Sequence, residues 1–354
     1  MATLRGFDRK FYFSHATTQT TWGTLEAAAD LHPFRVNSDP FVIAPEFVND
    51  TDLVGGYEEA SSQEEVARGV SGSVTQNRAV AAFLGPLLAY TLGTSTDSLQ
   101  DTSAYRHIII PTPATFVMPT FSALDLFTAT YYIAYHNLAI DSLELSTQLK
   151  GWLDVKAQCV GSGKTATTGV TVGSLGAAVT MGPSLKAGDL KIYLGVDQGV
   201  GLPATYSQTA ENLPATATAI TTIIKSFRWR VNNNLLADEA YGPGSGILRD
   251  RAERQRMSQS LSFSVEFADN TYLAYLTSQN NLGLEFQFVS ATLAGAATVY
   301  YGCNIAFPSV KLTAVPVTGG VGPLIANCEA LVLHDGTGPT VQATVFDKSA
   351  AYLG

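Results

Sequence analysis

The stretch most suggestive of chemistry is residues 161–165, GSGKT, which is similar to the end of a phosphate-binding loop. A complete loop has another glycine five residues before the glycine that precedes the lysine, because backbone N–H groups must wrap the phosphates. Gln158 stands there instead. Residues 166–173 are β-branched and glycine-rich, which disfavours the helix whose N-terminus would complete such a site. We therefore interpret GSGKT as the start of a flexible linker.

Other residue types that carry catalysis are scattered along the chain. The cysteines are Cys159, Cys303 and Cys328, and the histidines are His15, His32, His107, His136 and His334. None has the spacing of a zinc site or of a nucleophile and base, so we expect buried free thiols and structural histidines. The paired carboxylates Glu58/Glu59 and Glu64/Glu65 lie in a polar stretch without flanking aromatics, which favours solvent exposure over hydrolysis. We expect no enzyme, cofactor or metal.

Composition restricts the protein class. Of 354 residues, 46% are hydrophobic and only 14% are charged, well below the usual quarter, so much of the surface must be buried. No apolar run is long enough to span a bilayer, and the N-terminus lacks the apolar core of a signal peptide, so we expect synthesis in the cytoplasm and no membrane partner. The net charge of -9 argues against tight binding to nucleic acid.

Four stretches recur in the same order along the chain. The matched pairs are 10–13 with 191–194, 34–37 with 229–232, 73–74 with 264–265, and 137–146 with 304–313. The recurrence predicts two related domains, 1–160 and 188–354, joined by a Gly/Thr/Ser-rich linker over 161–187.

Each predicted copy contains strands and one helix. The apolar stripe from Val80 to Leu88 predicts a helix packed on a sheet, with Asn77 as its N-cap and a kink or a break at Gly85 and Pro86. A shorter helix in the second copy is capped by Asp269 or Asn270. The strands alternate apolar and polar residues. The sequence thus predicts a mainly β fold: two copies of an antiparallel sandwich or barrel with a flanking α-helix.

The set resembles the tail tube proteins of phages with long flexible tails. The stretches that carry the resemblance are 71–93 (SGSVTQNRAVAAFLGPLLAYTLG), 105–110 (YRHIII), 137–146 followed by 151–153, and 345–353 (VFDKSAAYL). The resemblance implies stacked rings that form a hollow tube for DNA, with a β-barrel lining the channel and a loop reaching the next ring. Family rings hold six domains, so a chain with two domains implies a pseudo-hexameric trimer in the virion. Implied partners are other copies of the chain, the tape measure protein and viral DNA in the lumen without tight binding, and the tail terminator and tail-tip proteins.

Two long loops differ in charge. Residues 45–69 carry seven acidic residues against one arginine, a net charge of -6, whereas residues 249–256 carry four arginines against two acidic residues, a net charge of +2. If the copies alternate around a ring, opposite loops on successive rings could fix one rotational register. The alternative is that each charge run is a solvated loop face. The predicted contacts between rings are Glu58, Glu59, Glu64, Glu65, Arg249, Arg251, Arg254 and Arg256.

The last expectations concern the charge of the channel wall and two alternative functions. A wall that conducts DNA should be acidic or neutral, and Glu144, Asp154 and Glu329 are candidates for it. One alternative is the inner tube of a contractile tail or injection machine, which shares the domain. The other, from a different class, is a β-sandwich carbohydrate-binding or hydrolytic protein.

Overall fold

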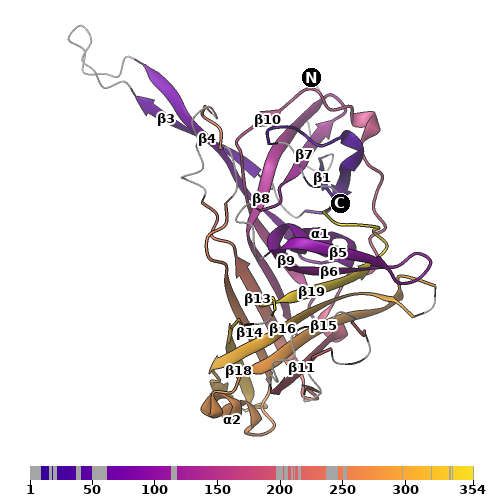
Figure 1. Cartoon of the computed structure of the whole chain (residues 1–354), viewed down its shortest axis with the longest axis vertical. Coiled ribbons are helices and arrows are strands. Elements are labelled where there is room, and N and C mark those ends of the chain that lie inside the picture. The colour runs from indigo at the N-terminus through magenta and orange to yellow at the C-terminus, as the bar shows by residue number, and fades with distance from the viewer. Residues whose placement is uncertain are drawn as a thin grey trace.

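The fold is taken from a computed structural model, in which the chain is mainly antiparallel β with two α-helices, as the sequence predicts (Figure 1). The structure describes residues 9–15, 18, 22–36, 41–49, 62–112, 118–196, 202, 206–208, 210, 212–213, 217–236, 246–249, 253–296, 298–319, 321–334, 336 and 338–353.

The elements follow one another in a similar order in the two halves of the chain. The first half contains β1 (Lys10–Ser14), β2 (Leu31–Phe34), β3 (Phe41–Asn49), β4 (Gln63–Gln76), α1 (Ala81–Leu92), β5 (Gly93–Leu99), β6 (Tyr105–Pro111), β7 (Phe121–Thr128), β8 (Tyr131–Gln148), β9 (Asp154–Gly161) and β10 (Thr165–Ala166). The second contains β11 (Leu190–Val196), β12 (Thr218–Ala219), β13 (Ile224–Asn232), β14 (Ser258–Glu266), α2 (Thr271–Ser278), β15 (Leu282–Leu293), β16 (Tyr300–Ala314), β17 (Val317–Thr318), β18 (Ile325–Val332) and β19 (Gln342–Asp347).

Strand pairing repeats the same order in each half. In the first half neighbouring strands follow the order β2, β1, β7, β8, β9, β4, β3. In the second half the order is β12, β11, β15, β16, β18, β14, β13. The β5–β6 hairpin is an addition to the first half, and β6 pairs with β19. This order fits two related halves, whose boundaries at 1–160 and 188–354 stay a prediction.

Three of the four recurring stretches fall on strands in matching places. These are β1 with β11, β4 with β14, and β8 with β16. The match of 34–37 with 229–232 is wrong. Phe34 ends β2, which pairs with β1, whereas Trp229 lies in β13, which pairs with β14 and β8. Asn37 lies outside the described residues. An aromatic residue followed by Arg-Val-Asn fits any half-buried strand, so the short pattern misplaced the element.

Two strand pairings join the two halves into one sheet, β6 with β19 and β8 with β13. Residues 142–148 of β8 pair antiparallel with residues 226–232 of β13. At the centre of this joint Leu145 lies opposite Trp229, and both are fully buried. Trp229 in turn packs edge-on against Phe307 of β16, with ring centroids 5.6 Å apart. One hydrophobic core therefore runs through both halves of the chain.

Helix α1 is enclosed by strands. Every residue from Ala81 to Leu92 is buried, and the helix packs against β8 on one side and β5, β6 and β19 on another (Figure 1). Its sequence has no charged residue, which suits a helix that is apolar all round. Helix α2 is mostly exposed and lies at the far end of the second half (Figure 1).

The predicted N-cap of α1 is wrong, and so is the predicted break into two helices at Pro86, whereas the predicted kink stays a prediction. The N-cap is Val80, not Asn77, because the backbone of Ala79 is already held extended by hydrogen bonds with Leu153 and Leu185. Pro86 lies inside one continuous helix. A proline leaves the carbonyl four residues earlier without its helical donor.

His15 supplies a replacement for that missing donor. The carbonyl four residues before Pro86 belongs to Ala82, and His15 Nε2 lies 2.9 Å from its oxygen. This contact from outside the helix explains how Pro86 is accommodated.

In the second helix, Asn270 is the N-cap, as predicted. The capping hydrogen bond, however, comes from its neighbour: the Thr271 N–H donates to Asp269 Oδ1 over 2.8 Å.

Two segments that were predicted to lack regular structure contain strands or backbone hydrogen bonds to the rest of the chain. Of the predicted loop 45–69, residues 45–49 belong to β3 and residues 63–69 to β4, so the loop prediction is wrong there. Pro45 is tolerated because β3 is an edge strand. Residues 161–187, predicted as a flexible linker, contact the first half: β10 pairs with β8, and the Leu185 N–H donates to the Ala79 carbonyl over 2.8 Å.

Gly85 provides a test of how tightly α1 is enclosed. A Cβ atom there would lie 2.2 Å from the ring of Tyr352, so Gly85→Ala must displace the C-terminal residues. We expect a loss of about 1–3 kcal/mol in the free energy of unfolding, measured by urea denaturation. Gly173→Ala is the control, because nothing lies within 4 Å of a Cβ at that position. Equal stability of the two variants would contradict the packing described.

Candidate assembly surfaces

One face of the central strands is mainly polar. In β13 and β14 the residues alternate: Phe227, Trp229 and Val231 are buried, whereas Arg228 and Arg230 between them are exposed. The serines of β14 at positions 258, 260, 262 and 264 likewise alternate with buried Leu261, Phe263 and Val265. Because successive side chains point to opposite faces of a sheet, the arginines and serines share one face. We call the exposed side of β8, β9, β13, β14 and β18 the polar face.

Charges on the polar face are arranged with opposite signs side by side. Glu144 on β8 lies directly opposite Lys156 on β9 and Arg230 on β13. Arg228 Nη2 donates to Glu144 Oε2 over 2.7 Å. These neighbours largely cancel one another, so the face is mixed in charge rather than acidic.

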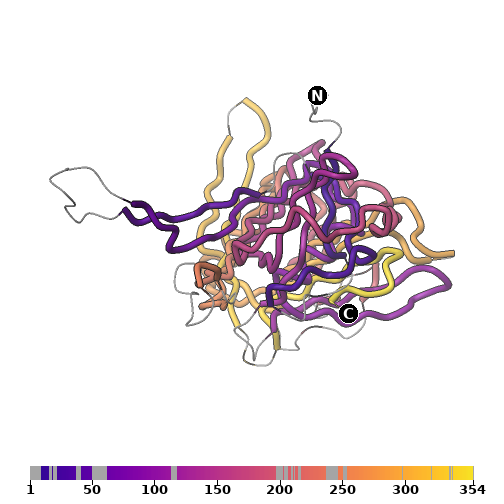
Figure 2. The backbone as a smooth tube through the Cα atoms, turned by 90° about the horizontal axis from the view of Figure 1, so that it is seen from above, coloured from indigo at the N-terminus to yellow at the C-terminus, as the bar shows by residue number. Residues whose placement is uncertain are grey.

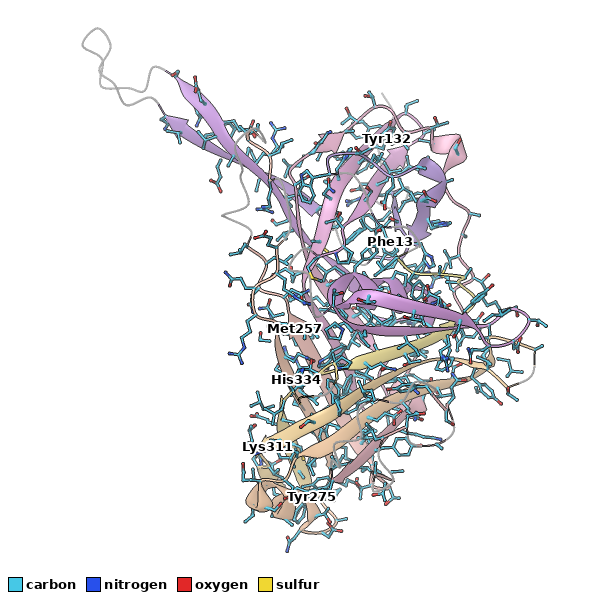
Figure 3. All side chains as sticks on the ribbon, in the orientation of Figure 1. Phe13, Tyr132, Met257, Tyr275, Lys311 and His334 are labelled. Carbon is cyan, nitrogen blue, oxygen red and sulfur yellow. The ribbon has the colours of Figure 1, made fainter. Side chains whose placement is uncertain are left out.

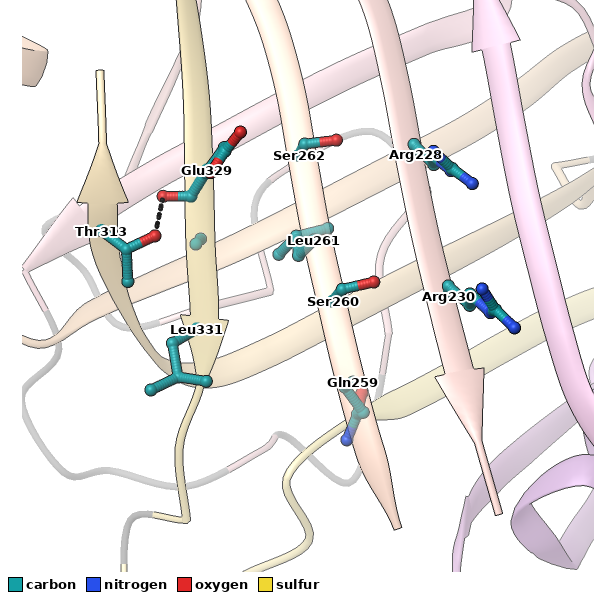
Figure 4. Close-up of a pocket in the computed structure, with 10 residues that line it drawn as sticks. Arg228, Arg230, Gln259, Ser260, Leu261, Ser262, Thr313, Glu329 and Leu331 are labelled. Atoms are coloured by element: carbon teal, nitrogen blue, oxygen red, sulfur yellow. Dashed lines mark hydrogen bonds between the residues drawn. The ribbon is translucent and has the colours of Figure 1, made fainter. Parts of the chain in front are cut away.

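A shallow hollow of about 480 Å³ lies on the polar face between β13, β14 and β18 (Figure 4). Arg228 and Arg230 extend from β13, Ser260 and Ser262 from β14, and Glu329 from β18. The lining mixes hydroxyl, charged and apolar side chains, and Leu261 and Leu331 are among its apolar members. Such a lining offers no tight site for a phosphate, since the cations are few and have an acidic neighbour.

The three predicted channel residues lie on this face, together with residues that the prediction missed. Asp154 lies opposite Ser146, and Glu329 lies opposite Ser262. The missed members are the cations Lys156, Arg228 and Arg230 and the serines of β14. Their signal was the strict alternation in the stretches 224–232 and 258–266, which separates a polar face from a core face.

Strands β3 and β4 form an arm that projects from the body (Figures 1 and 2). Its exposed apolar side chains are Val42, Ile43, Phe47, Val48 and Val66. Of the predicted acidic contacts, Glu64 is exposed on this arm, and Glu65 pairs with Arg68 over 2.6 Å. Glu58 and Glu59 lie outside the described residues. The arm therefore combines exposed apolar side chains with negative charge.

The predicted arginine contacts occupy different environments. Arg249 is only 8% exposed, and its Nη1 donates to the Gly161 carbonyl over 2.9 Å, so it belongs to the fold. Arg256 is exposed, and Arg251 lies outside the described residues. Arg254 is half-buried and donates through Nη2 to the Thr112 carbonyl over 2.7 Å. Arg254 and Arg256 are thus the described arginines still placed to reach another molecule.

A mainly apolar pocket of about 560 Å³ adjoins Arg254. Met257, Pro339 and His334 help to line it, and Met257 and His334 lie near one another in Figure 3. Arg254 Nη1 is buried without a hydrogen-bond partner, and burial lowers the pKa of Arg254. An unpaired guanidinium N–H beside apolar walls suits a carboxylate carried on an apolar surface.

The GSGKT stretch is part of the sheet. Gly161 ends β9, Thr165 begins β10, and Lys164 Nζ donates to the Gly23 carbonyl. The Arg249 N–H donates to the Ser162 carbonyl over 3.0 Å. Because a strand follows, the N–H groups do not converge as they do at a helix N-terminus.

The reactive residue types are also placed in the fold. All three cysteines are free and buried, as predicted, and burial raises the pKa of each thiol. Within the described ranges, no group of three or more His, Cys, Asp or Glu residues could hold a metal ion. No helix in the described part of the chain is long and apolar enough to cross a membrane.

Comparison with known proteins finds similar chains among solved structures. No family model matches the chain, and no curated protein matches it. Among solved structures it is similar to a doubly mutated Hcp1 protein from E. coli EAEC 042 pathovar, at 15% identity. The match covers 40% of this chain and 85% of that protein, with a TM-score of 0.25. A likeness at that score carries no argument about function.

Replacing arginines separates those in the fold from those available to a partner. Arg249→Gln removes a buried hydrogen bond to the chain, so we expect a loss of about 1–3 kcal/mol in the free energy of unfolding. The exposed Arg256→Gln is the matched control, with an expected change within about 0.5 kcal/mol. Denaturation curves measure both. Arg249→Gln with the stability of the control would show that Arg249 does not support the fold.

Proposed function

We propose that this chain is a structural protein that assembles with copies of itself, through the edges of its sheet, into a closed ring. The observation that carries the proposal is the pairing of β8 with β13 inside the chain. This pairing is a finished joint between the two halves. The corresponding edges at the outer ends of the sheet have no partner among the described strands.

The first open edge is β3. In the second half β13 pairs with β14 on one side and with β8 on the other. In the first half β3 occupies the corresponding place beside β4, and within the described residues β4 is its one partner strand. An unpaired edge strand presents N–H and C=O groups that can bind another strand.

The second open edge is the end of β16 with β17. Ser71 of β4 lies opposite Val160 of β9, as Ser262 of β14 lies opposite Glu329 of β18. Counted from these pairs, Ile325 of β18 takes the place of Lys156 of β9. Thr318 of β17 lies opposite Ile325, so it takes the place of Glu144, which lies opposite Lys156. The place of β13 beside Thr318 is open in the described chain.

The two open edges have matching faces. Glu144 lies opposite Arg230 of β13, and Arg230 lies opposite Ser260. Ala44 of β3 lies opposite Gly69, which takes the place of Ser260. By this correspondence Ala44 of one copy would lie opposite Thr318 of another. The neighbouring positions, Ile43 and Val317, would then lie on the core face.

Exposure at those neighbouring positions supports the pairing. Inside the chain the corresponding residues, Trp229 and Leu143, are 0% and 1% exposed. At the open edges Ile43 and Val317 are each 37% exposed. A strand pairing between copies would bury both, which is the favourable hydrophobic contribution that such an assembly needs.

The proposed contact is heterologous, since it joins different surfaces of identical chains. Such a contact generates a ring when the rotation between successive copies closes. With six domains around the ring, three copies close it, and the polar face lines the channel. Its small hydroxyls and balanced charges would let DNA pass without strong phosphate contacts. Rings stacked through the β3–β4 arm would give the tube of a long-tailed phage, with the tape measure protein and DNA inside and the terminator and tip proteins at its ends.

The inner tube of a contractile tail or injection machine remains the second candidate within this class. The same edges, arm and polar face would serve it, and a sheath protein that binds the outside of the tube would distinguish the two. We propose no catalytic role, since neither the polar face nor the pocket beside Arg254 brings a nucleophile to a base.

Cysteine cross-linking tests the ring. In the double variant Ala44→Cys with Thr318→Cys, a short thiol cross-linker should join different chains, because directly opposed residues have Cβ atoms about 5 Å apart. We expect covalent dimers and trimers, and no larger closed species, on a denaturing gel. The three native cysteines are buried and should not react.

A matched control places the second cysteine away from the edge. Ser260 lies on the polar face in the middle of the sheet, so Ala44→Cys with Ser260→Cys should give monomers. Failure to cross-link in the first variant, with intact rings in electron micrographs, would contradict the proposed strand pairing. A protein that stays monomeric at every concentration would contradict the ring itself.

Charge reversal tests stacking separately from ring formation. Arg256→Glu leaves the strand edges untouched and should repel the acidic arm of the next ring. We expect rings of wild-type mass but tubes shortened at least about tenfold, measured by electron microscopy. Lys191→Glu, at an exposed cation of β11, is the control and should leave tube length unchanged. Wild-type tube lengths in the first variant would refute the contact.

A further inference from the structure

A buried polar cluster, away from the proposed assembly surfaces, ties the C-terminal residues to the β5–β6 hairpin. Asp97 comes from β5, His107 from β6 and Asp347 from β19, and Tyr352 follows in the last residues of the chain. The side chains of His107 and Asp347 are fully buried. We call these four residues the C-terminal cluster.

His107 contacts a carboxylate through each ring nitrogen. Its Nδ1 lies 2.7 Å from Asp97 Oδ1, and its Nε2 lies 3.0 Å from Asp347 Oδ1. A carboxylate can only accept, and a neutral imidazole has one N–H, whereas an imidazolium has two. Both contacts are therefore hydrogen bonds only when the ring carries its positive charge. In the neutral ring, one lone pair would face a carboxylate oxygen.

The two carboxylates also hold the C-terminal residues directly. Asp347 Oδ2 accepts from the Tyr352 hydroxyl over 2.6 Å and from Ser349 Oγ over 2.9 Å. Asp97 Oδ2 accepts from the Tyr352 backbone N–H over 3.1 Å. Because the same two groups bind His107 and the chain end, the charge on the ring and the position of the end are linked.

Tyr352 connects the cluster to α1. Its ring stacks on His107 with centroids 3.9 Å apart and an interplanar angle of 24°. The same ring covers Gly85, where a Cβ would lie 2.2 Å away. A charged imidazole over an aromatic face is a favourable contact, and it weakens when the charge is lost.

The surrounding groups favour the charged ring. Burial disfavours the charged form of His107 and lowers its pKa. The hydrogen bonds that the ring donates to Asp347 and Asp97 outweigh the effect of burial, so the pKa of His107 is raised. Burial would raise the pKa of Asp347, yet the contacts with His107 and Tyr352 lower it. Burial likewise works against Asp97, and its hydrogen bond with His107 lowers the pKa of that carboxyl.

Two further titratable rings contact the cluster, His15 and Tyr105. His15 lies against the Tyr352 ring, and burial lowers the pKa of His15 to about 4, so it stays uncharged while His107 is charged. Tyr105 stacks on the far side of His107 with centroids 6.4 Å apart. Burial and the charge of Asp347 raise the pKa of Tyr301.

We propose that the C-terminal cluster is a pH-dependent latch. While His107 is doubly protonated it binds Asp97 and Asp347 together and holds residues 348–353 on α1. Loss of one proton from the ring places a lone pair against a carboxylate and releases these residues. The latch is independent of the proposed ring, because none of its members lies at the open edges or in the arm.

The sign of the pH dependence follows from the direction of each shift. The stabilisation from His107 is complete below the ordinary imidazole pKa of 6.5 and is lost as pH rises through the higher value in the folded protein. The stabilisation from the carboxylates is present above their ordinary pKa of 3.8 and is lost as pH falls through their lower folded values. The latch therefore opens on the alkaline side.

Hydrogen exchange of the C-terminal peptide tests the latch. Between about pH 6 and about pH 9, protection factors corrected for intrinsic exchange should fall at least about tenfold in residues 348–353. A peptide from β15 serves as the internal control and should not change. In His107→Gln the C-terminal peptide should be poorly protected at both pH values, whereas His334→Gln, at an exposed histidine, should behave as wild type.

A second measurement keeps the proposal testable if His107→Gln does not fold. Nitrogen-15 NMR of the wild-type protein distinguishes an imidazolium from either neutral tautomer. At about pH 6 both His107 nitrogens should be protonated, and one should lose its proton over the range in which C-terminal protection falls. A neutral ring at about pH 6, or C-terminal protection that stays constant to about pH 9, would overturn the latch.

Discussion

The rest of the structure depends on the backbone pairing of β8 with β13. Together with the pairing of β6 with β19, it joins the two halves into one sheet. The pairing buries Leu145 against Trp229 and extends one polar face across strands from both halves. Since backbone pairing is repeated at fixed spacing, the joint also fixes the register of Glu144 against Arg230. Geometry at the joint thus determines which charges meet on the polar face.

The long strands β8 and β16 make this arrangement possible by changing partners along their length. Strand β16 pairs with β19 over residues 302–306 and with β18 over residues 310–314. Pro308, which has no N–H to donate, lies between these two segments. In β8, residues 131–138 pair with β7 and residues 142–148 pair with β13, while β9 pairs with residues 138–146 across the bulge between Ile140 and Ser142. One strand can therefore belong to the core of its own half and to the joint with the next.

Sequence patterns predicted the strands and the two helices but not their enclosure or the arm. Alternation identified the β-rich fold because it reports which residues of a strand share a face. It could not report that α1 is covered on several sides, since Tyr352 and His15 reach α1 from distant parts of the chain. The arm was missed because Pro45 and the acidic residues resemble a loop. The polar face was predicted through three acids, whereas its cations become apparent only when the strands are in register.

The arm also shows how an exposed strand edge is protected from uncontrolled pairing. Exposed strand edges are templates for uncontrolled aggregation, and proteins protect them with prolines, bulges and charge. All three devices occur at this edge. Strand β3 contains Pro45 and an irregularity between Glu46 and Phe47, and Glu64 of β4 lies opposite Val48. These features restrict which strands can pair with β3, and so oppose amyloid-like stacking through the arm.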